Sequence, residues 1–124
     1  MKNTTKLIAT GFAAFTLAGA AYSQTTIVNI TGATAFRAAA NTSIIALLGG
    51  AGTTEYTFDT TTGSSAGATN RAIYRGTVAG IPGTVIVRAS WSGSTAGIAA
   101  VAAGTPVQVL KTTTAMSTAG TGFA

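Results

Sequence analysis

The chain has 124 residues and a formal net charge of +5, and 47% of its residues are hydrophobic while only 7% are charged. It contains no cysteine and no histidine, and Glu55 and Asp59 are its only acidic residues. These counts argue against a Cys or Ser nucleophile with a His base, and against a metal site built from soft ligands or clustered carboxylates. We therefore expect a binding protein without catalytic residues, metal or cofactor.

Residues 1–23 have the pattern of a signal peptide. Lys2 and Lys6 precede an uncharged, mostly apolar run over residues 7–20, and Ala21-Tyr22-Ser23 supplies small residues for cleavage after Ser23. We expect export to the periplasm, the cell surface or the medium. The remaining cations are dispersed rather than clustered, which argues against nucleic-acid binding.

The first half of the remaining chain predicts a strand, a helix and a second strand. β-Branched residues indicate a strand at 25–30, and residues 31–34 form a turn. Apolar residues at helical spacing predict an amphipathic helix over 35–48, which Gly49-Gly50 ends. Alternating residues at 55–59 predict a half-buried strand, followed by a Thr/Ser/Gly-rich loop over 60–70.

The second half predicts a hairpin, a helix and a last strand. β-Rich runs at 72–79 and 84–90 surround Gly80-Ile81-Pro82-Gly83, which indicates a hairpin. A short helix follows at 95–103, with Gly104 after its end. Residues 106–110 suit a final strand, and residues 111–124 contain no predicted element.

Alternating strands and helices favour an α/β sheet with helices packed on it. The two strand-to-helix junctions, at residues 31–34 and 92–95, would then both lie at carboxyl ends of strands, where open α/β sheets bind ligands. We expect the two loops to face one crevice. The large residues expected in the core are Phe36, Ile44, Leu47, Leu48, Tyr56, Phe58, Ile73, Val85, Val87, Trp91, Ile98 and Val101.

The loop Gly93-Ser94-Thr95 is the strongest candidate for a ligand contact. Hydroxyls and free backbone N–H groups at a helix N-terminus favour an oxyanion. The alternative is that Ser94 or Thr95 caps its own helix. Both interpretations remain open from sequence.

Arg75 and Arg88 form a second candidate site. A hairpin centred on Ile81-Pro82 would place them directly opposite each other on one face. Two like charges there are destabilising unless an anion, Glu55 or Asp59 lies between them. The alternatives are side chains that splay into solvent, or a different register.

Two motifs resemble the start of a phosphate-binding-type periplasmic substrate-binding protein: Ile30-Thr31-Gly32-Ala33-Thr34-Ala35-Phe36 and Ser92-Gly93-Ser94-Thr95-Ala96-Gly97-Ile98. The resemblance implies that residues 24–110 are the N-terminal lobe of that fold and that 111–124 is an incomplete tail. It also implies a small oxyanion such as phosphate as ligand, and a membrane permease as partner of the full-length protein. The implied ligand-binding residues are Thr34, Ala35, Phe36, Gly93, Ser94, Thr95 and Ala96.

This sequence departs from the family's pattern in four ways. Ala35 is an extra residue in the first motif, and a long Thr-rich segment with a hairpin separates the two motifs. No aspartate follows Gly104 to accept the ligand's proton, and a second lobe is missing. We therefore expect an N-terminal part of a binding protein, or a truncated relative. The alternative is a structural or adhesive surface protein without a small-molecule ligand, since Thr/Ala/Gly-rich, weakly charged β sequences are typical of extracellular arrays.

Overall fold

The computed structural model describes residues 24–123, so the predicted signal peptide lies outside the described residues. Strands form where β-branched residues concentrate, and helices form in the Ala-rich segments. The elements are β1 (Thr25–Thr31), a 3-10 turn (Thr34–Phe36), α1 (Arg37–Leu47), β2 (Glu55–Asp59), β3 (Arg71–Val78), β4 (Ile81–Ser90), α2 (Ser94–Ala102) and β5 (Thr121–Phe123).

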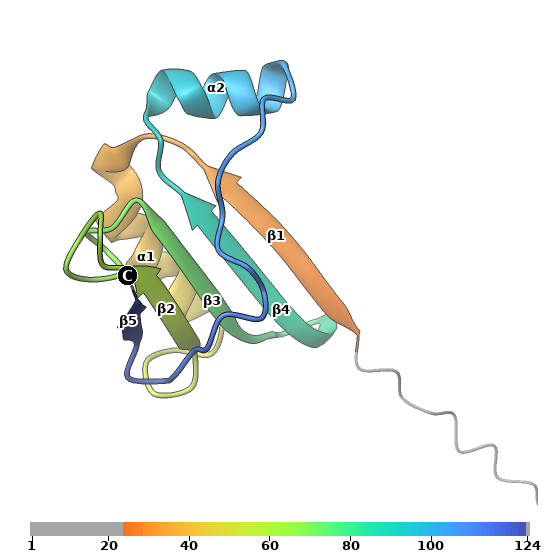
Figure 1. Cartoon of the computed structure of the whole chain (residues 1–124). Coiled ribbons are helices and arrows are strands. Elements are labelled where there is room, and N and C mark those ends of the chain that lie inside the picture. The colour runs from red at the N-terminus through yellow and green to blue at the C-terminus, as the bar shows by residue number, and fades with distance from the viewer. Residues whose placement is uncertain (1–23, 124) are drawn as a thin grey trace, which may run out of the picture.

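The five strands form one mixed sheet in the order β1-β4-β3-β2-β5 (Figure 1). β1 pairs with β4 in parallel, and β3 pairs antiparallel with both β4 and β2. The short β5 pairs in parallel with β2. The α/β class expected from sequence is confirmed at this level, as a mixed sheet with two helices.

Helix α1 covers one face of the sheet. Ile44 and Leu48 are buried there against Tyr74, Val85 and Val87. The Tyr74 hydroxyl donates to Asn41 Oδ1 at 3.1 Å, and burial, with a smaller effect of Tyr56, raises the pKa of the phenol above its usual value.

Two residues predicted to join the core from this helix do not. Phe36 is 67% exposed and Leu47 is 59% exposed. Ile44 and Leu48, four residues apart, form the stripe that packs on the sheet, whereas Phe36 lies in the 3-10 turn before α1. The prediction for Phe36 and Leu47 is therefore wrong.

The opposite face of the sheet is covered by an extended segment after α2, which runs across the strands in Figure 1. Leu110 is buried there against Ile73 and Ile86, with Met116 beside them. The strand predicted at 106–110 is absent, because this segment lies over the sheet face and Pro106 has no N–H for a ladder. Residues 121–123, for which we expected no element, form β5.

The hairpin register differs from the predicted one. Arg75 pairs with Ile86 and Arg88 pairs with Ile73, so the two arginines share a face but are not directly opposite. The chain turns at Ala79-Gly80, and the register shifts between Gly76 and Val78. Pro82, which cannot donate to the ladder, and Gly83, with φ +83°, account for the irregularity on β4.

Helix α2 lies beyond the carboxyl ends of β1 and β4 rather than on a sheet face (Figure 1). Its predicted core residues Ile98 and Val101 are 69% and 82% exposed, because the helix projects past the sheet. Among residues 24–123, neither helix is long and apolar enough to cross a membrane.

Gly76 is needed where the end of α1 meets β3. A Cβ at this position would lie 2.3 Å from the Leu48 carbonyl oxygen. We expect Gly76→Ala to lower the free energy of unfolding by about 1–3 kcal/mol, measured by urea titration, since the contact leaves no room for a methyl group. Thr77→Ala, at an exposed neighbouring position, is the control and should change stability by less than about 0.5 kcal/mol. Equal effects would contradict this assignment.

Candidate functional site

The loops that follow β1 and β4 are in direct contact. Thr31 and Ser90 are register partners at the ends of the two parallel strands, so the loops leave the sheet side by side. The Gly93 amide donates to the Gly32 carbonyl at 3.1 Å. Gly97 packs so closely that a Cβ there would lie 2.9 Å from Gly32 Cα. The expectation that the two junctions meet at one edge of the sheet is therefore confirmed.

The first turn of α2 is not capped by a side chain. Its N-cap is Gly93, with φ +99°, a conformation that favours glycine. Ser94 and Thr95 are exposed, and their hydroxyls make no hydrogen bond among the described residues. The capping alternative is therefore wrong, and the N–H groups of this turn remain available to a ligand.

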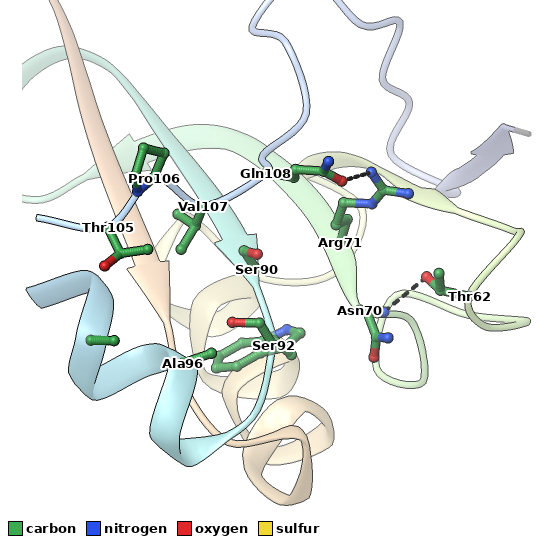
Figure 2. Close-up of a pocket in the computed structure, with 12 residues that line it drawn as sticks. Thr62, Asn70, Arg71, Ser90, Ser92, Ala96, Thr105, Pro106, Val107 and Gln108 are labelled. Atoms are coloured by element: carbon green, nitrogen blue, oxygen red, sulfur yellow. Dashed lines mark hydrogen bonds between the residues drawn. The ribbon is translucent and has the colours of Figure 1, made fainter.

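A polar-rimmed cavity of about 540 Å³ lies beside this turn (Figure 2). Ser90 and Ser92 stand at the end of β4 between α2 and Arg71, and the segment after α2 closes another side with Gln108. The cavity is lined by Thr62, Asn70, Arg71, Ser90, Trp91, Ser92, Ala96, Ala99, Thr105, Pro106, Val107 and Gln108.

Arg71 is the charged side chain that lines this cavity, and it forms an ion pair with Asp59. Its Nε donates to Asp59 Oδ2 at 2.8 Å, and Nη1 donates to Gln108 Oε1 at 3.0 Å. The Thr61 hydroxyl and amide also donate to Asp59. The Thr61 hydroxyl, with its amide and Arg71, holds the pKa of Asp59 below its usual value, although burial acts in the opposite direction. The guanidinium is thus fixed in place while part of it stays accessible.

Two buried polar atoms in the described part of the chain have no hydrogen-bond partner, Trp91 Nε1 and Thr31 Oγ1. Trp91 is only 4% exposed and belongs to the cavity lining. Buried polar atoms without a partner are costly, and in native proteins an ordered water, an ion or a ligand commonly supplies the partner. Thr31 is the last residue of β1, and Trp91 directly follows the last residue of β4.

A second cavity, of about 480 Å³, lies between the loop after β1 and helix α2 and is mainly apolar. We call it the apolar groove; it is lined by Thr31, Gly32, Ala33, Phe36, Ser94, Gly97, Ile98, Val101 and Ala102. The exposed side chains of Phe36, Ile98 and Val101 line this groove.

The structure divides the predicted ligand residues between these two cavities. Ala96 lines the polar cavity, whereas Phe36 and Ser94 line the apolar groove. The remaining four, Thr34, Ala35, Gly93 and Thr95, line neither cavity. All seven stay close in the chain to the contact between Gly32 and Gly93.

Arg75 and Arg88 do not belong to this site. Arg75 donates to Glu55 Oε2 at 2.6 Å, and Arg88 donates to Asn29 Oδ1 at 2.7 Å. Glu55, one of the two carboxylates considered for neutralising the pair, thus binds Arg75 alone. Sequence reasoning missed Arg71, although the correct hairpin register places it opposite Ser90, next to the loop.

Within residues 24–123, His, Cys, Asp and Glu do not form a group of three or more that could hold a metal ion. Comparison of the chain with protein-family models, with curated proteins and with solved structures finds no match. The functional argument therefore rests on the geometry of the loops and the polar cavity.

The lowered pKa of Asp59 predicts a loss of stability in acid. Because the folded-state pKa lies below the unfolded one, the ionised carboxylate stabilises the fold above about pH 4, and this contribution disappears as pH falls through the folded-state pKa. We expect Asp59→Asn to be less stable at pH 7 and to show a smaller acid-induced loss, measured by urea titration from pH 7 to 2.5. Glu55→Gln changes the more exposed ion pair and leaves Asp59 intact, so it should lose stability in acid as the natural chain does. An unchanged acid profile in Asp59→Asn would contradict the assignment.

Proposed function

We propose that this chain is a binding domain for a small anion such as phosphate, held in the polar cavity beside the loops after β1 and β4. The observation that carries the proposal is the contact of these two loops at the carboxyl ends of parallel strands, next to the fixed cation Arg71. Ligands of open α/β sheets bind at this edge.

Three kinds of donor support an anionic ligand. The first turn of α2 has N–H groups without a side-chain cap, and the helix dipole favours negative charge there. Arg71 borders the cavity with a guanidinium held by Asp59 and Gln108. Trp91 contributes a buried indole N–H without a partner. A donor-rich cavity without a free carboxylate suits an acceptor-rich anion.

The resemblance to phosphate-binding-type periplasmic proteins supports the same proposal. Both motifs of that resemblance lie at the loop contact, through Gly32 and Gly93. In this proposal residues 24–110 correspond to a first lobe, residues 1–23 direct export, and a membrane permease is a partner of the full-length protein. The ligand is held by backbone N–H groups and hydroxyls.

Titration of the purified chain with inorganic phosphate, and separately with sulfate, tests the proposal. Trp91 is the only tryptophan of the chain, so its fluorescence reports on the cavity while calorimetry gives the affinity. Arg71→Gln removes the guanidinium that borders the polar cavity. We expect at least about tenfold weaker binding of the preferred anion, since a hydrogen bond to a charged group is lost.

Arg75→Gln is the matched control, because Arg75 is also an ion-paired arginine but lines neither cavity. It should bind the anion like the natural chain. Equal binding by Arg71→Gln would contradict the placement of the anion beside Arg71. The absence of heat and of fluorescence change with both anions at about 10 mM would contradict the proposed function.

A further inference from the structure

The outer edge of β1 is an unprotected sheet edge. Within residues 24–123, β1 pairs only with β4, and no strand or helix covers its other side. Natural edge strands are usually protected by charges, prolines, bulges or short length. β1 has seven residues, is regular, and contains no charge and no proline.

The backbone groups that point away from the sheet can be identified from the pairing with β4. The Gln24 carbonyl accepts from the Thr84 amide at 2.8 Å, so Gln24 faces β4. In a parallel ladder alternate residues face the same neighbour. The N–H and C=O groups of Thr25, Ile27, Asn29 and Thr31 therefore point outward, available to another strand.

Each face of the sheet exposes one large apolar side chain along this edge. Ile27 is 48% exposed on one face, and its neighbour Val28 is 40% exposed on the other. An added strand would cover both side chains at once, which a ligand on one face could not do. The nearest cation, Arg88, lies one strand inside the edge and donates to Asn29.

We propose that β1 pairs antiparallel with β1 of a second copy, about a two-fold axis at Val28, to form one continuous sheet. In this register Thr25 pairs with Thr31 of the second copy, and Ile27 pairs with Asn29. All four outward-facing residues then lie in hydrogen-bonded pairs, while Val28 meets its own counterpart in a non-hydrogen-bonded pair. No charged residue faces a like charge.

The same geometry limits the assembly to a dimer. A two-fold contact uses the same patch on both copies and is closed. The other edge of the sheet is formed by β5, which has only three residues. The interface is small, so we expect a weak dimer with a dissociation constant of about 100 µM.

Sedimentation equilibrium of the purified chain at about 10 µM to 1 mM tests this proposal, with an expected rise from monomer to dimer mass. Val28→Lys places two like charges at the axis and should abolish the dimer. Ile81→Lys is the matched control, because Ile81 is also an apolar residue 40% exposed in a strand, and it should dimerise. A monomer throughout the range, or an undiminished dimer in Val28→Lys, would overturn the proposal.

A cysteine variant tests the register without relying on charge. The chain has no cysteine, and non-hydrogen-bonded partners have Cα atoms about 4.5 Å apart, within the range of a disulfide. Val28→Cys should therefore form a covalent dimer in mild oxidant, whereas Ile81→Cys should remain monomeric on a denaturing gel. Equal crosslinking of the two variants, or none in Val28→Cys while the natural chain dimerises, would show that another surface is used.

Discussion

The parallel pairing of β1 with β4 is the constraint on which the rest of the candidate site depends. It brings Thr31 and Ser90, far apart in the chain, to the same end of the sheet. The loops that follow can then meet only because Gly97 has no side chain and Gly93 adopts a positive φ. A side chain at Gly97 would separate α2 from the loop after β1, and a non-glycine residue at position 93 would be strained by the positive φ.

The two faces of the sheet differ in chemistry, and this difference places a cation in the cavity. One face has the apolar core under α1, whereas the other has the ion pairs of Arg71 with Asp59 and Arg75 with Glu55. An extended segment can cover such a face because its own polar groups interact with the charged side chains, as Gln108 does with Arg71. A helix with an apolar stripe would bury these ion pairs without offering them further hydrogen bonds.

Sequence patterns predicted both helices and the first four strands well, but not the last strand or the spatial relations of the elements. The strand at 55–59 has the predicted bounds, and both helices begin and end within two residues of the expected positions. The hairpin register was wrong because the irregularity at Pro82-Gly83 has no periodic signal, and Arg71 was missed with it. Phe36, Ile98 and Val101 have the spacing of core residues, but spacing does not show whether another element covers them. β5 was missed because three residues have no periodicity.

The abundance of threonine has a structural role that composition alone did not reveal. The loop after β2 contains no helix or strand, yet Thr69 is fully buried and donates to the Asp59 carbonyl, while Thr62 interacts with Thr69. Thr69 thus satisfies a backbone oxygen of Asp59, and the Thr61 hydroxyl and amide donate to its carboxylate. Asp59 can therefore stay ionised and hold Arg71 although the chain has few charges. The threonine residues of this weakly charged chain thus supply the hydrogen bonds that hold Asp59 in place. Asp59 in turn fixes Arg71 beside the α2 loop.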